Sequence, residues 1–195
     1  MNDTKNYILG LRDTLAERLA GRFLFLLLLL ALSCGGAFAV TSRISCGGYF
    51  LAVHPLNTGG SLPHTVVSLI RCTLPAAVSL LAVGFSVHTA ASQAVSAAVI
   101  LWRGICLGCA GALMADGTVR SLGTHWILAL TLYFAASVLI ILLAACTHIY
   151  SLGLCRAYAD RTHRIRREIV REYLRVFLIL SGGVFLLTCG TVLMI

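Results

Sequence analysis

An arginine in the middle of a long apolar run is the first residue whose type and position need a chemical explanation. The run covers residues 90–115 and contains Arg103 beside Gly104. A charge at bilayer depth costs from about 3 to more than 10 kcal/mol and usually faces a cavity or a partner. All seven acids of the chain lie outside its apolar runs. Arg103 must therefore meet lipid phosphate by snorkelling, backbone carbonyls at a helix break near residues 102–104, or an acidic group on another protein.

Two cysteines in the same run have the spacing of a redox pair or of half a zinc site. Cys106 and Cys109 form a CxxC motif, but tetrahedral zinc needs a second pair or histidines, and redox chemistry needs a thioredoxin-like helix start. Inside an apolar helix, cysteine behaves as a small hydrophobe. His54 and His64 have no cysteine or acidic cluster near them. We expect no metal, no cofactor and no enzymatic activity, and we find no phosphate-binding loop, HExxH or GxSxG motif.

Small residues recur at helical spacing through this run and predict a face that packs against another helix. Gly104 and Gly108 form a GxxxG pair, and Gly111 continues it. Small side chains let two helix backbones approach closely in lipid, where hydrophobic burial offers no net drive. The alternative is ordinary glycine-rich membrane sequence that faces lipid. The predicted stripe, in a central packing helix, comprises Ala94, Ala97, Leu101, Gly104, Gly108, Gly111 and Ala115.

The composition places the chain in a membrane. Of its 195 residues, 59% are hydrophobic and 11% are charged, and the mean hydropathy is +0.94. These values exceed what a soluble domain carries as apolar content. The net charge of +8 gathers in two segments that flank apolar runs, which indicates contact with the lipid bilayer and argues against nucleic acid as a partner.

Hydropathy predicts an all-α polytopic bundle with five transmembrane helices and short loops. An amphipathic arm over residues 1–22 precedes a single transmembrane domain over 23–195. In the second predicted span Arg71 lies about a turn and a half inside the N-terminal start and can snorkel towards lipid or meet a partner, while Gly84 is a packing position. The spans cover about 23–40, 66–87, 90–115, 126–147 and 176–195.

Charge predicts the orientation. The N-terminal arm and residues 148–175 are basic, whereas the other loops contain only Arg43 and Arg120. The excess of positive charge marks the cytoplasmic side, so we expect a multi-pass protein of the cell membrane with its N-terminus in the cytoplasm and its C-terminus outside. A four-span version with a re-entrant central region competes with this topology. The basic segment 148–175 includes Arg156, Arg161, Arg164, Arg166, Arg167, Arg171 and Arg175.

Two stretches resemble the stage II sporulation protein M family of bacterial membrane proteins. The first is LLAVGFSVHTAASQAVSAAVILWRGICLGCAGAL over residues 80–113, in which Gly84, Arg103, Gly104 and Gly108 match the family's pattern of a glycine-bearing helix followed by a basic-Gly pair. The second is EYLRVFLILSGGVFLLTCG in the last helix. The resemblance implies a non-enzymatic membrane scaffold that, in spore formers, holds peptidoglycan-degrading partners at the membrane.

Two other classes of function stay open. A permease or accessory subunit of a multi-component transporter would use the basic segment to dock on a cytoplasmic ATPase. An intramembrane enzyme would use Cys106, Cys109 or the histidines. The missing acidic counterpart of Arg103 leads us to expect other membrane proteins as partners, or self-association. The resemblance to the family implies that peptidoglycan hydrolases are among these partners.

Overall fold

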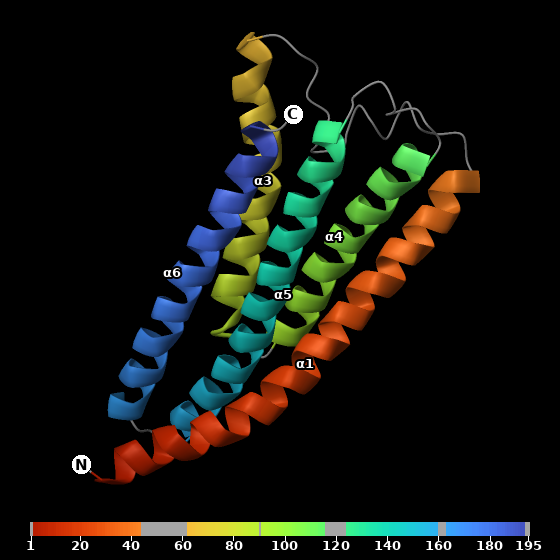
Figure 1. The fold of residues 1–195 in the computed structure, drawn as a ribbon. Helices are drawn as coiled ribbons and strands as arrows, with labels where there is room; N and C mark the ends of the chain where they lie inside the picture. Colours follow the sequence, from red (N-terminus) through yellow and green to blue (C-terminus); the bar gives the residue numbers. More distant parts are fainter. Residues whose placement is uncertain (1, 44–61, 90, 116–123, 160–162, 194–195) are drawn as a thin grey trace.

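The protein is a bundle of helices (Figure 1). The computed structural model describes the backbone of residues 2–43, 62–89, 91–115, 124–159 and 163–193, and these ranges contain helices and no strand. The predicted all-α class is therefore confirmed. The helices are α1 (Asn2–Arg43), α3 (Leu62–Ser86), α4 (Ser92–Ala115), α5 (Thr124–Ala159) and α6 (His163–Leu193).

Within the part of the chain that the structure describes, four helices are long and apolar enough to cross a membrane. They are the segments Arg18–Arg43, Ser92–Ala115, Ile127–Ala159 and Ile165–Thr191, each at or beyond the roughly 20 residues that a bilayer core requires. The second predicted span corresponds to α3, a helix of 25 residues whose described side chains form an apolar stretch over Thr73–Ser86. Pro75 lies inside α3 without ending it, as neighbouring helices permit in membranes.

The helices continue across the limits of the predicted segments. The arm 1–22 and the first span are one continuous helix, α1. The predicted basic segment 148–175 is divided between two helices, because α5 continues to Ala159 and α6 begins at His163. The reason is packing: Leu154 and Ala157 of α5 are buried against Ile169 and Tyr173 of α6 in a second apolar cluster. This burial extends both helices past the limits that hydropathy alone suggests.

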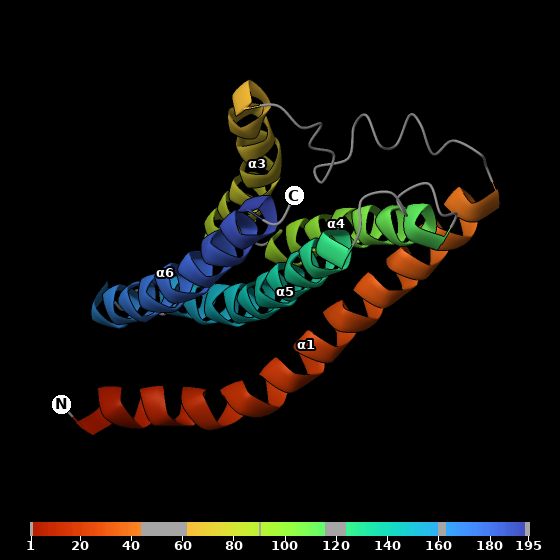
Figure 2. The same cartoon turned by 45° about the horizontal axis from the view of Figure 1, so that its top comes forward.

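Helix α4, predicted as a central packing helix, has the largest buried share of the candidate spans. The other helix at the centre of the bundle is α5. It contacts all four other helices, and Ile140, Ile141, Leu143 and Ala144 on it are fully buried in the main core. The most extensive helix pairs are α1 with α4 and α5 with α6. Figure 2 shows α1 alongside α4 on one side of α5, with α3 and α6 together on the other.

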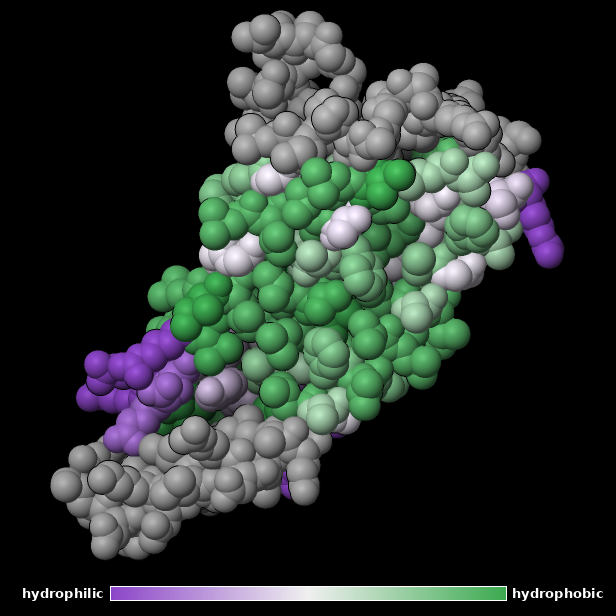
Figure 3. Space-filling view, viewed as in Figure 1, coloured by the Kyte–Doolittle hydropathy of each residue, from purple (hydrophilic) through white to green (hydrophobic). Residues whose placement is uncertain are grey.

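Charged and apolar surfaces are separated along the bundle. Hydrophilic side chains gather over the N-terminal half of α6, and a wide hydrophobic region covers the middle of the visible face (Figure 3). One end of the bundle brings together the N-terminal part of α1, the α3–α4 turn, the C-terminal end of α5 and the N-terminal end of α6 (Figure 1). The two predicted basic segments thus share one end. The side of the membrane that this end faces stays a prediction.

Candidate functional site

Arg103 lies in the interior of the bundle. Only 2% of the residue is exposed, and its Nη1 donates a hydrogen bond of 3.0 Å to Oγ of Ser137 on α5. The Ser137 hydroxyl in turn donates to the carbonyl oxygen of Tyr133 at 2.9 Å. The guanidinium carbon also lies 4.9 Å from the centre of the Tyr133 ring, where the negative face of the ring attracts a cation. Ser137 and Tyr133, which lie one turn apart on α5, therefore both contact the charged guanidinium group of Arg103.

This geometry corrects the expectation that Arg103 contacts lipid or a partner. Helix α4 is continuous across residues 102–104, so no break offers free carbonyls. The side chain that faces outwards at this level is that of the preceding residue, Trp102, which is 58% exposed. The one ion pair among the described residues joins Arg175 to Glu172, so no described carboxylate pairs with Arg103. The buried Nε of Arg103 has no hydrogen-bond partner among these residues. A hydroxyl and an aromatic ring of the same chain take the place of the carboxylate that we sought outside it.

The two CxxC sulfurs belong to different interfaces. Cys106 hydrogen-bonds with Tyr133 of α5, whereas Sγ of Cys109 lies 3.3 Å from Oγ1 of Thr41 on α1. Both thiols are free. The described residues contain no group of three or more His, Cys, Asp and Glu side chains that could hold a metal ion. The two cysteines therefore contact different helices, Cys106 α5 and Cys109 α1.

The GxxxG pair is the contact surface between α4 and α1. A Cβ built on Gly104 would lie 2.8 Å from the carbonyl oxygen of Leu30 and would clash with Ser33, and one on Gly108 would lie 2.9 Å from the backbone nitrogen of Phe38. Real Cβ contacts essentially never come this close, so only glycine allows the two backbones to approach in this way. Gly111 has an ordinary contact with the ring of Phe38.

The rest of the predicted stripe differs from the structure. Leu101 is 39% exposed and Ala94 is exposed, so neither takes part in the α1 interface. Ser92, Ser96 and Ile100 are buried in this half of α4 instead. The buried face of α4 therefore includes Gly104 and Gly108, which contact α1, but not the N-terminal part of the predicted stripe.

A second polar link joins α3, α5 and α6 at the end of the bundle where α3 meets α4. The Tyr173 hydroxyl donates to the carbonyl oxygen of Gly84 at 3.1 Å and lies 3.0 Å from Oγ1 of Thr147. A Cβ on Gly84 would be 2.5 Å from the Phe177 ring, so this glycine permits a close approach of α3 and α6. Sequence reasoning missed Tyr173 and Thr147 as partners, because a tyrosine at this depth gives no signal of what it will bind.

The same end holds the turn between α3 and α4 against α5. Oγ of Ser151 donates to the carbonyl oxygen of Thr89 at 3.1 Å, and Oγ of Ser92 lies 3.4 Å from Nδ1 of His148. Thr89 closes the turn by bonding to the Ser86 carbonyl oxygen at 2.9 Å. These bonds satisfy backbone groups that the end of a helix leaves free.

The basic segment is partly anchored and partly exposed. The guanidinium carbon of Arg166 lies 4.9 Å from the centre of the Tyr158 ring, whereas Arg156, Arg167 and Arg171 are exposed. Arg161 lies outside the described residues. The side chains of Arg164 and Arg71 also lie outside them, although both residues are within helices.

No protein-family model, curated protein or solved structure matches the chain.

Proposed function

We propose that the protein is a non-enzymatic scaffold of the cell membrane that works in a complex with cell-wall-remodelling partners, as its resemblance to the stage II sporulation protein M family implies. The observation that supports this proposal is that interior polar side chains of the protein form hydrogen bonds between different parts of the bundle. The hydroxyls of Ser137 and Tyr173 bind groups on other helices, and that of Ser151 binds the turn between α3 and α4. Polar side chains that join helices favour a rigid platform over a reaction centre.

Chemical crosslinking in native membranes, followed by purification of the tagged protein, tests the proposal. We expect a peptidoglycan hydrolase among the crosslinked proteins. It should be retained by Leu101→Val, a conservative change at a partly exposed position. At matched membrane levels it should be lost from Gly108→Leu, which separates α1 from α4.

The transporter alternative predicts a different result from the same experiment. It rests on the exposed arginines Arg156, Arg167 and Arg171, which could dock on an acidic surface of a cytoplasmic ATPase. Recovery of an ATPase subunit and no hydrolase would favour that alternative. Recovery of neither class with the wild-type protein would refute the scaffold proposal.

A further inference from the structure

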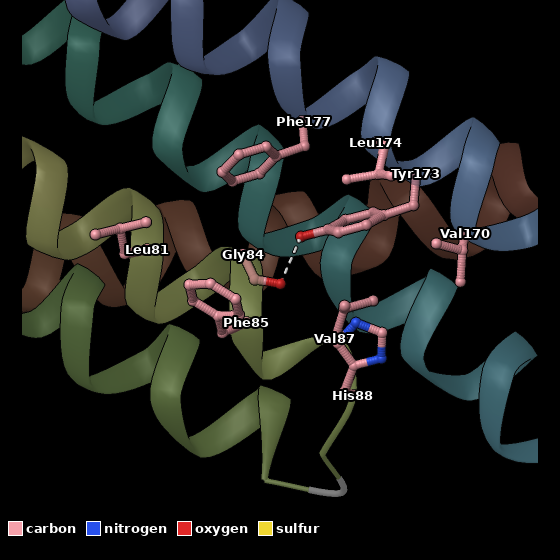
Figure 4. A pocket seen from close by; sticks show the side chains of 9 residues that line it. All are labelled: Leu81, Gly84, Phe85, Val87, His88, Val170, Tyr173, Leu174 and Phe177. Carbon is pink, nitrogen blue, oxygen red and sulfur yellow. Dashed lines mark hydrogen bonds between the residues drawn. The ribbon is translucent and has the colours of Figure 1, made fainter.

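An apolar cleft of about 160 Å³ lies between α3 and α6, next to the α3–α4 turn. Figure 4 shows its walls, with Leu81 and Phe85 on α3 and Leu174 and Phe177 on α6. Its rim lies on the outer surface, because Leu81 is 52% exposed, Leu174 is 50% exposed and Phe85 is 70% exposed. The cleft therefore opens towards the membrane rather than into the bundle.

The size and lining of the cleft suit a stretch of hydrocarbon chain. An apolar cavity of about 150 Å³ lined by similar side chains is large enough to take up benzene. A helix with its side chains is about 10 Å wide and needs a much broader groove. The bond between Tyr173 and the carbonyl oxygen of Gly84, 3.1 Å long, fixes the two walls to each other. The cleft is thus a preformed site for one acyl chain.

Positive charge lies at the end of the cleft where the apolar surface stops. Arg167, Val170, Leu174 and Phe177 follow one another at steps of three and four residues, so they share one face of α6. Arg167 and Arg171 are exposed. The Glu172 carboxylate pairs with Arg175 at 2.8 Å and not with Arg171. From the opposite wall the exposed His88 lines the same cleft.

The change from charged to apolar surface marks the level of the lipid phosphates. On α6 the exposed side chains are charged at Arg167 and Arg171, and also at Glu172 and Arg175, which pair with each other. Leu174 is the first exposed apolar side chain, and beyond Arg175 the exposed side chains Leu178 and Ile179 are apolar. An acyl chain in the cleft would therefore place its headgroup beside the two arginines, where a phosphate accepts charge-assisted hydrogen bonds.

We infer that the α3–α6 cleft binds an anionic phospholipid. One acyl chain lies between Phe85 and Leu174, and the phosphate lies beside Arg167 and Arg171. A zwitterionic lipid can fill the cleft equally well, but its net charge of zero gives it a weaker interaction with the two arginines. The two arginines therefore select lipids by headgroup charge, and the acyl chain in the cleft fixes the position of the bound lipid.

Native mass spectrometry of the purified full-length protein tests the headgroup. The protein is mixed with equal amounts of phosphatidylglycerol and phosphatidylcholine of the same acyl chains. We expect preferential retention of phosphatidylglycerol. Arg167→Gln combined with Arg171→Gln should lower that retention about 10- to 30-fold. Arg43→Gln combined with Arg156→Gln removes the same charge from exposed positions elsewhere and should leave it unchanged. Equal retention of both lipids, or an equal loss in the control, would overturn the inference.

A second arm tests the cleft itself. Leu174→Trp should fill the cleft and reduce lipid retention with both arginines intact, whereas Leu178→Trp, one turn further along and 68% exposed, should not. Circular dichroism and gel filtration verify that each variant is folded. Glycerol phosphate, which carries the phosphate without a chain, should fail to displace the lipid. Displacement by glycerol phosphate, or equal behaviour of the two tryptophan variants, would show that the cleft does not hold the chain.

Discussion

Replacing Ser137 by alanine tests whether the protein itself holds Arg103 inside the bundle. The change removes the hydroxyl that accepts the 3.0 Å bond from Arg103. Hydrogen bonds to charged groups contribute about 1.5–3 kcal/mol in water-soluble proteins, whereas polar contacts between membrane helices average about 0.6 and reach about 1.7 kcal/mol. Because Arg103 is charged and 2% exposed, we expect the free energy of unfolding to fall by about 1–2 kcal/mol.

Comparing Ser137→Ala in the wild-type protein and in an Arg103→Met variant separates the loss of the Arg103–Ser137 hydrogen bond from other effects of the substitution. In an Arg103→Met variant, Ser137→Ala should have little effect, because no charge needs the hydroxyl. Arg103→Met itself should be neutral or stabilising, since apolar replacement of buried charges is often tolerated. Ser96→Ala is the matched control, because the Ser96 hydroxyl is buried and has no hydrogen-bond partner among the described residues. Its removal should be neutral or slightly stabilising.

The assay is reversible unfolding in mixed micelles by titration with dodecyl sulfate, followed by the fluorescence of the two tryptophans and by far-ultraviolet circular dichroism. The four proteins of the cycle give the coupling free energy between Arg103 and Ser137. A coupling near zero, with Ser137→Ala equally destabilising in both backgrounds, would refute the internal hydrogen bond. It would return Arg103 to the lipid or partner contact that the sequence suggested.

Three further changes test other parts of the structure. Gly108→Leu should reduce the amount of folded protein in membranes far more than Leu101→Val, because bulk at residue 108 meets the backbone of α1; equal accumulation of the two would contradict that contact. Tyr173→Phe should lower the free energy of unfolding by about 0.6–1.7 kcal/mol through loss of the bond to Gly84, with the exposed Tyr158→Phe as a neutral control in the same titration. Reporter domains at the two termini should show a cytoplasmic N-terminus and an exported C-terminus, and a cytoplasmic C-terminus would rule out five spans.

Composition and periodicity were sufficient for the class of fold, because a chain in lipid must satisfy its backbone within helices. The same physics identified most of the helices from their apolar runs, and charge identified the end of the bundle where the basic residues gather. Spacing also singled out Gly104 and Gly108 as packing positions before their neighbour was known. It did not identify that neighbour, since any helix could offer a backbone to a glycine.

The partner of Arg103 was decided by tertiary structure alone. The sequence showed that a charge lay in an apolar run and that no acid was near, and from this we sought a group outside the chain. Serine and tyrosine are common in membrane helices and carry no mark that they will meet an arginine, so Ser137 and Tyr133 could not be selected from the sequence. Only the packing of α4 against α5 brings residues 34 and 30 positions apart into contact. Composition can reveal that a buried charge needs a counterpart, but the rotation and depth of each helix determine which neutral groups provide it.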